Sequence, residues 1–146
     1  MTATESVVWR AATITAVREE AREVRTFTFR FDEPVVHLPG QHYELRLTSE
    51  DGYRAARLYS AASVAVPSGR ELELTIMRLE NGEVSPYLFD HANVGTQIEL
   101  RGPLGKYFVW EIDDARPALL IGGGTGVVPL RAMLLAHAGS QGQMEL

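Results

Sequence analysis

Apolar and polar side chains alternate with a period of two over most of the chain between Val7 and Trp110, and this alternation restricts the fold more than any other feature. The period is typical of β-strands that bury one face. Three runs show it most clearly, with polar residues between their members: Phe27, Phe29 and Phe31; Tyr43, Leu45 and Leu47; and Leu72, Leu74 and Ile76. Much of the chain is therefore expected to form strands.

Turn residues separate these runs at regular intervals, as at Pro39-Gly40 and Asn81-Gly82. Several short strands spaced in this way indicate a closed or nearly closed antiparallel barrel. We therefore predict a mainly β fold, an antiparallel Greek-key β-barrel of about six strands. One short helix should interrupt the barrel, because Ser85 is a preferred N-cap residue and Pro86 would then occupy the first helical position.

The pattern changes after Asp113. The run from Ala118 to Ile121 is continuously apolar, as in a parallel strand buried on both faces, and after a glycine cluster apolar residues recur at helical spacing up to His137. One strand and one helix cannot make a doubly wound sheet. We predict a barrel domain over residues 1–113 and, over residues 114–146, the first β-α unit of a truncated α/β domain.

The composition excludes several classes of site. A formal net charge of −5 argues against broad nucleic-acid affinity, which comes from neutralising many phosphates with Lys and Arg. The absence of cysteine excludes disulfides, thiolate zinc sites and iron–sulfur clusters held by cysteines within these residues. The histidines show no spacing typical of a metal site, so no bound metal is expected.

The sequence also predicts where the protein resides. No apolar run approaches the roughly 20 residues that cross a bilayer, so no membrane span is expected. The first residues, Met1 to Glu5, lack the basic and apolar regions of a signal peptide. A cytoplasmic location is the resulting expectation.

The first group of candidate site residues is Arg57-Leu58-Tyr59-Ser60, in a predicted strand. Strand geometry places Arg57 and Tyr59 on one face. An arginine fork can hold a phosphate bidentately, and an aromatic face can pack on a planar heterocycle beside it. A flavin nucleotide offers both features. Taken alone, however, these residues are more simply explained as a solvated strand face.

The second group is Gly82-Glu83-Val84-Ser85-Pro86, where a glycine loop enters the short predicted helix. The first N–H groups of a helix have no partner within the helix, and they attract phosphate. The alternative is simple N-capping, which Ser85 could perform without any ligand.

The third group is Gly122-Gly123-Gly124-Thr125-Gly126-Val127-Val128-Pro129, which connects the predicted parallel strand to the predicted helix. In open α/β sheets, dinucleotides bind at such a position. Pro129 stands where the usual dinucleotide motif has its third glycine, so the residues do not indicate a standard Rossmann site. The alternative is a tight glycine-rich turn.

In order and spacing, the barrel pattern and these motifs resemble the ferredoxin:NADP reductase-like superfamily, especially its oxygenase-reductase and flavodoxin-reductase branches. The matching motifs are Arg57-x-Tyr59-Ser60, Gly82-x-x-Ser85 and Gly124-x-Gly126-x-x-Pro129. The resemblance implies an oxidoreductase that takes hydride from NAD(P)H to FAD, with FMN less favoured. Electrons would then pass to a protein such as a ferredoxin, flavodoxin or oxygenase, or to a small acceptor.

The resemblance also implies roles for the strand motif, in which Tyr59 and Ser60 are the expected catalytic residues. Arg57 would contact the flavin phosphates, and Leu58 lies in the same cofactor-binding stretch. Tyr59 would pack against the isoalloxazine ring, and Ser60 would hydrogen-bond near flavin N5.

Three further segments are implied as nucleotide contacts. The backbone around Ile76, Met77 and Arg78 would line the nucleotide. The pyrophosphate would be held by Gly82, Glu83, Val84 and Ser85. The nicotinamide cofactor would be guided by Gly124, Thr125, Gly126 and Pro129.

Two other interpretations stay open from the sequence. A siderophore-reducing flavoprotein would use the same barrel and deliver electrons to ferric chelates. A flavin-free barrel that serves as an interaction module would leave the glycine loop as a mere turn.

Overall fold

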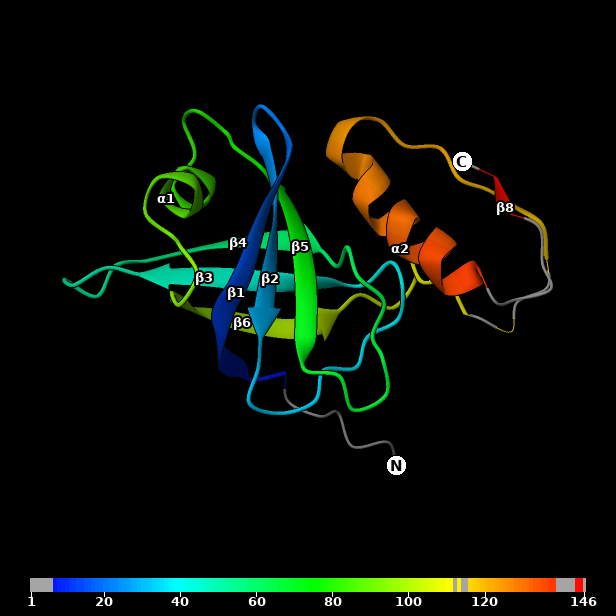
Figure 1. Ribbon diagram of the computed structural model, residues 1–146, viewed down its shortest axis with the longest axis horizontal. Coiled ribbons are helices and arrows are strands. Elements are labelled where there is room, and N and C mark those ends of the chain that lie inside the picture. Colours follow the sequence, from blue (N-terminus) through cyan, green and yellow to red (C-terminus); the bar gives the residue numbers. More distant parts are fainter. Residues whose placement is uncertain (1–6, 112, 114–115, 139–143, 146) are drawn as a thin grey trace.

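The computed structural model describes residues 7–111, 113, 116–138 and 144–145. Its main body is one six-stranded sheet in which every neighbouring pair of strands is antiparallel (Figure 1). The strands are β1 (Trp9–Ala21), β2 (Val24–Arg30), β3 (His42–Thr48), β4 (Arg54–Ser60), β5 (Glu71–Met77) and β6 (Gln97–Leu104). The mainly β, antiparallel fold expected from the sequence is therefore confirmed.

The strand order leaves a seam in the barrel. It runs β4-β3-β6-β1-β2-β5, so the chain crosses back after β5 to place β6 between β1 and β3, the long return of a Greek key. The two ends of the sheet, β4 and β5, are joined by an isolated bridge between Ala61 and Leu74. Among the described residues, no ladder joins the rest of β5 to β4, and one backbone edge of Thr75–Met77 therefore faces the seam.

The interior of the barrel follows the period-two pattern. Phe27, Phe29, Leu72, Leu74 and Ile76 are all fully buried in one cluster. Because alternate strand residues point to opposite faces, their polar neighbours face outward. Tyr43 and Leu45 are buried in the same cluster, with Leu47 half-buried beside them. The expected core positions of these strands are thus confirmed.

A short helix, α1 (Val84–Asp90), follows β5 and packs Val84 and Leu88 into the barrel core. The helix was expected, but the predicted N-cap is wrong. Glu83 is the N-cap residue, and Ser85 lies inside the first turn, buried. The Ser85 hydroxyl oxygen accepts a hydrogen bond from the Leu79 N–H at 3.0 Å, so it braces the preceding loop instead of capping the helix.

The second part of the chain is a small β-α unit beside the barrel (Figure 1). Its two short strands pair in parallel, as the sequence predicts for the run after Asp113. Its elements are β7 (Ala118–Leu119), the 3₁₀ turn η1 (Gly124–Gly126), α2 (Val127–His137) and β8 (Met144–Glu145).

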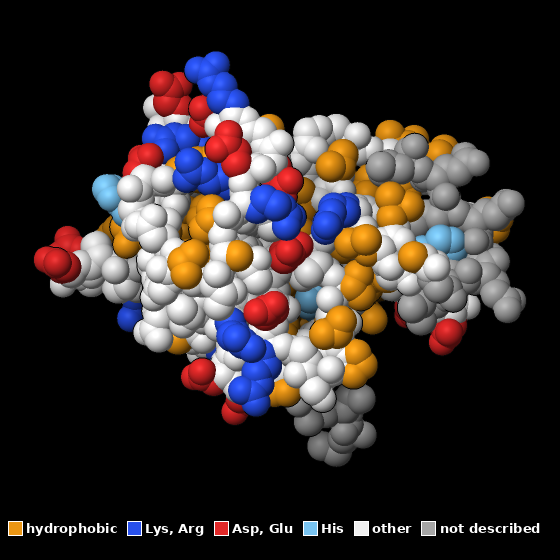
Figure 2. Space-filling view, viewed as in Figure 1, with side chains coloured by type: hydrophobic (Ala, Val, Ile, Leu, Met, Phe, Trp, Pro, Cys, Tyr) orange, Lys and Arg blue, Asp and Glu red, His pale blue; other side chains and the backbone are white. Residues whose placement is uncertain are grey.

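The expectation that this strand is buried on both faces is wrong. Ala118 and Leu120 pack against Trp110 and α2, whereas Leu119 is 69% exposed and Ile121 is 85% exposed. The reason is that α2 covers one face and no described element covers the other. In Figure 2, hydrophobic side chains gather around α2, while charges of both signs are interspersed over the barrel.

An apolar joint holds α2 against the barrel. Trp110, Leu130 and Met133 form a buried cluster, and the backbone N–H of Trp110 donates to the Pro39 carbonyl at 2.9 Å. Gly40 has a φ of +98°, and a Cβ placed there would lie 2.1 Å from the Phe108 oxygen and 2.7 Å from Met133 Cε. This turn of the barrel therefore requires glycine both for its conformation and for the close approach of the Phe108 carbonyl.

None of the described helices is long and apolar enough to cross a bilayer. Within the described residues, no group of three or more His, Asp or Glu side chains is arranged to hold a metal ion.

Candidate functional site

The strand motif lies at the open end of the sheet, on β4. Ala55, Arg57 and Tyr59 share one face of this strand by alternation, and Leu58 points to the other face with 58% exposure. The Arg57 side chain is 53% exposed, while Tyr59 is half-buried and packs against the barrel core. Burial raises the pKa of Tyr59 to about 12, so its phenol stays protonated and the ring is neutral.

The structure brings the second motif directly to the first. Glu83, the residue before α1, accepts a hydrogen bond from Arg57 Nη2 at 3.2 Å with its Oε2 atom. Its other oxygen, Oε1, accepts a hydrogen bond from the Tyr53 hydroxyl at 2.7 Å. The guanidinium of Arg57 therefore already binds an oxyanion at this position, the kind of group that a phosphate would supply.

The loop that carries Glu83 is tightly built. The Gly82 N–H donates to the Leu79 carbonyl at 2.9 Å, and the Leu79 N–H donates to Ser85. A Cβ at Gly82 would lie 3.2 Å from the Leu79 oxygen and 3.3 Å from the Ser85 hydroxyl oxygen. A side chain at residue 82 would thus press on the loop that presents Glu83 and Val84 to β4.

The three expected contact residues at the end of β5, Ile76, Met77 and Arg78, differ in where their side chains lie. Ile76 is fully buried in the barrel core, and by strand alternation its backbone groups point to Arg25 of β2, while those of Thr75 and Met77 point to the seam. Met77 is 41% exposed. Arg78 binds the Asp90 carboxylate at the end of α1 and holds the pKa of that carboxyl below its ordinary value. Its side chain therefore anchors α1, a role that the motif did not indicate.

The glycine loop forms the turn between β7 and α2. Gly124 has a φ of +56°, a conformation that glycine adopts without strain, and a Cβ there would meet nothing within 4 Å. A Cβ at Gly122 would instead lie 2.8 Å from Leu130 Cδ1, so this glycine lets the chain pass close to the helix. Pro129 is buried in the first turn of α2, where its missing N–H costs no helical hydrogen bond.

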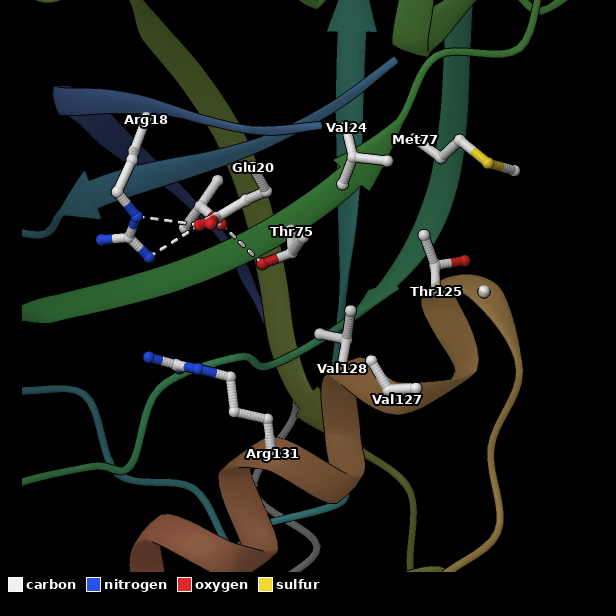
Figure 3. A pocket seen from close by; sticks show the side chains of 11 residues that line it. Arg18, Glu20, Val24, Thr75, Met77, Thr125, Val127, Val128 and Arg131 are labelled. Carbon is white, nitrogen blue, oxygen red and sulfur yellow. Dashed lines mark hydrogen bonds and ion pairs between the residues drawn. The ribbon is translucent and has the colours of Figure 1, made fainter. Parts of the chain in front are cut away.

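A cavity of about 340 Å³ separates this loop from the barrel. Figure 3 shows its two sides, with Thr125, Val127 and Val128 on α2 and η1 facing Thr75 and Met77 of β5. The loop is thus next to the same strand end whose backbone faces the seam.

The barrel wall of this cavity carries a hydrogen-bonded carboxylate. The Thr26 hydroxyl lies 2.6 Å from Glu20 Oε1 and 2.7 Å from the Thr75 hydroxyl, and Arg18 binds the same Glu20 oxygen. The Thr26 hydroxyl, followed by the Arg18 guanidinium, holds the pKa of Glu20 below its ordinary value. Glu20 therefore stays ionised at neutral pH.

The residues around the seam fit a flavin nucleotide. Arg57 offers a guanidinium to a phosphate, Tyr59 offers a neutral ring, and the free edge of β5 offers backbone hydrogen-bonding groups. Sequence reasoning missed two residues at this site, Tyr53 and Arg131, because each acts through a contact with a distant segment. No local pattern marks such contacts.

Residues 11–109 match the family described as the oxidoreductase FAD-binding domain. The chain belongs to this family. The match confirms the resemblance drawn from the three motifs, and it confirms FAD as the cofactor of the barrel.

The chain is also similar to reductases known from their sequences and from solved structures. The naphthalene 1,2-dioxygenase system ferredoxin–NAD(P)(+) reductase component of Pseudomonas putida is 34% identical over 122 residues, which are 84% of this chain and 35% of that protein. The crystal structure of an Amycolatopsis cytochrome P450 reductase matches with a TM-score of 0.76 and 32% identity, covering 95% of this chain and 43% of the other. The structure of the ferredoxin reductase in carbazole 1,9a-dioxygenase matches with a TM-score of 0.75 and 31% identity, covering 87% of this chain and 38% of the other. The chain therefore spans about a third of the length of the curated relative.

Proposed function

We propose that the barrel binds FAD at the seam between β4 and β5 and that the whole protein is an NAD(P)H-dependent flavin oxidoreductase. The observation that carries this proposal is the meeting of Arg57 with Glu83, which joins the strand motif to the start of α1 at the open edge of the sheet. Two motifs that are far apart in the sequence thus meet where Arg57 already holds a carboxylate oxygen, which supports a phosphate position there.

The strand motif would position the flavin. Arg57 would offset the charge of the flavin phosphates in place of its present bond to Glu83. Tyr59 would pack against the isoalloxazine ring and keep water from it, and Ser60 would hydrogen-bond near flavin N5. Leu58, which points to the other face of β4, would contribute backbone contacts only.

The neighbouring segments would hold the remainder of the nucleotide. Backbone N–H groups of Glu83, Val84 and Ser85, which follow the turn at Gly82, would bind the pyrophosphate. The segment Ile76–Arg78 would line the nucleotide through the backbone groups of Met77 that point away from β2. The loop with Gly124, Thr125 and Gly126, fixed by the buried Pro129, would guide the nicotinamide ring toward the flavin.

The flavin, when bound, supplies the redox chemistry itself. The residues of this chain contribute orientation, charge and the exclusion of water. Residues 1–113 would form the FAD-binding domain, and residues 114–146 would form the start of the NAD(P)-binding domain. The family match over residues 11–109 supports the first of these boundaries.

The printed names of the relatives support an electron-transfer role. They are a reductase component of a dioxygenase system, a cytochrome P450 reductase and a ferredoxin reductase. We propose that the whole protein likewise passes electrons to an oxygenase, a ferredoxin, a flavodoxin or a small acceptor. The cytoplasmic location expected from the sequence stays a prediction, and cell fractionation would check it.

An FAD titration tests the proposed site. Arg57→Ala should weaken FAD binding about 10- to 150-fold, because a hydrogen bond to a charged group contributes about 1.5–3 kcal/mol. The matched control is Arg54→Ala, which removes another exposed arginine from the same strand and should leave the affinity within about twofold. Equal affinities of the Arg57→Ala and Arg54→Ala proteins would refute the phosphate role of Arg57.

A further inference from the structure

Arg131 connects the helix beside the glycine loop to the barrel. Its Nη1 atom donates to the Ala62 carbonyl oxygen at 2.7 Å and lies 3.7 Å from a carboxylate oxygen of Glu73. Ala62 is the second residue after Ser60, and its N–H donates to the Glu73 carbonyl at 2.8 Å. A guanidinium on α2 therefore binds the backbone that continues directly from the β4 motif.

On this side of α2, a cavity lies between the glycine loop and the barrel. Its lining includes Gly124, Thr125 and Val127 from the loop and helix, and Thr75 and Met77 from β5. Figure 3 shows the Arg131 side chain extending from α2 along this opening, toward the side on which Arg18 lies.

The apolar joint at the other side of α2 is a different kind of contact. Trp110, Leu130 and Met133 bury surface, and such contacts have no preferred direction. A hydrogen bond from a guanidinium to a carbonyl has a preferred distance and angle. Among the described contacts between α2 and the barrel, the Arg131 to Ala62 bond is thus suited to set the orientation of the helix.

We propose that Arg131 is a positioning residue, which fixes the Gly124–Gly126 loop relative to the Tyr59–Ser60 end of β4. The inference rests on the proposed function, in which these two segments carry the nicotinamide and the flavin. Because misplacement of reacting groups by about 1 Å can cost a factor of about 100 in rate, a lost orienting bond should slow hydride transfer without weakening FAD binding.

The first experiment measures bleaching of the flavin band in the FAD-loaded chain under anaerobic conditions. Reduced nicotinamide mononucleotide is the probe, because it carries the reacting ring and needs no adenosine site. Arg131→Ala should lower the rate at saturating probe about 10- to 100-fold, with the FAD dissociation constant within about twofold of wild type. Reduction by dithionite, which needs no oriented site, should be unchanged.

Three further variants separate orientation from charge and stability. Arg131→Lys, which keeps the charge but loses the planar fork, should give an intermediate rate. Glu73→Gln should reduce the rate less than Arg131→Ala, since the bond to Ala62 remains. The control is Arg22→Ala, in the exposed turn between β1 and β2, which should behave as wild type.

The second experiment uses the FAD-free chain. Amide hydrogen exchange should become faster in residues 61–63 and 127–137 of Arg131→Ala and stay unchanged in Arg22→Ala. Unchanged exchange, or bleaching within twofold of wild type, would overturn the inference while leaving the proposed function standing. A wild-type chain that binds FAD but is not bleached by the probe would overturn the nicotinamide part of the function and this inference together.

Discussion

Replacing Glu83 with glutamine should strengthen FAD binding, although Glu83 lies inside the proposed site. In the structure, the Glu83 carboxylate accepts a hydrogen bond from Arg57 Nη2 at 3.2 Å. A phosphate that binds Arg57 must displace this carboxylate. Glutamine removes the negative charge and keeps an amide oxygen that can still accept the hydrogen bond of the Tyr53 hydroxyl.

The magnitude follows from the exposure of the pair. The side chains of Arg57 and Glu83 are 53% and 49% exposed, so the pair belongs to the class of surface ion pairs. Such pairs contribute about 0.2–1 kcal/mol, which corresponds to about a 1.4- to 5-fold change in a binding constant. FAD should therefore bind to the Glu83→Gln protein about 1.4- to 5-fold more tightly, and the gain should shrink at high salt.

The assay is an FAD titration of wild type and variants, followed by flavin fluorescence at low and high salt. Glu80→Gln is the control, because it removes an equal charge from the same exposed loop, and Glu80 makes no ion pair with Arg57 among the described contacts. Its affinity should change less than that of Glu83→Gln. An unchanged or weaker affinity in Glu83→Gln would refute the competition between this carboxylate and the phosphate.

Three other predictions concern the scaffold. Leu74→Ala, at a fully buried core position, should lower the free energy of unfolding, measured in urea, by about 2–5 kcal/mol. Leu79→Ala, at a 55% exposed position, should change it by about 0.5 kcal/mol or less, and equal losses in the two variants would contradict the barrel core. Burial lowers the pKa of His37, so the unfolded chain takes up a proton at this histidine first, and the free energy of unfolding should fall as the pH drops below about 6.5. In urea unfolding at pH 7.5 and 5.5, His37→Gln should lose less of this free energy than wild type, and an equal loss would exclude this histidine as the cause. Gly124→Ala should lower the local stability of the turn by roughly 1–2 kcal/mol, because residue 124 has a positive φ, and amide hydrogen exchange in α2 should become faster. Gly123→Ala, at a position with an extended backbone and equal open space, should leave the exchange unchanged, and similar effects of the two variants would rule out the conformational explanation.

The barrel could be predicted because its signals are local. The alternation of Phe27, Phe29 and their counterparts in other strands reports directly which face is buried, and turn residues mark the ends of the strands. The β-α unit after Asp113 was recognisable for the same reason. What depended on neighbouring elements was harder to predict, and the exposure of Leu119 and Ile121 is an example.

The details of the site could not be predicted, because they depend on contacts between distant segments. Ser85 looks like an N-cap in the sequence, yet its hydroxyl is used by the Leu79 N–H, which the loop folds back onto it. Glu83 finds Arg57 and Tyr53 only once the β3–β4 hairpin and the start of α1 lie together. Arg131 finds Ala62 only once α2 docks on the barrel.

The seam between β4 and β5 is the proposed flavin site, and binding of FAD there can be measured directly. The most direct measurement is to mix the purified chain with FAD, remove free cofactor by gel filtration and record the visible absorption spectrum of the protein peak. We predict a flavin band with resolved structure that elutes with wild type and is strongly reduced with Arg57→Ala. A colourless peak from folded wild-type protein would contradict a flavin site at this seam.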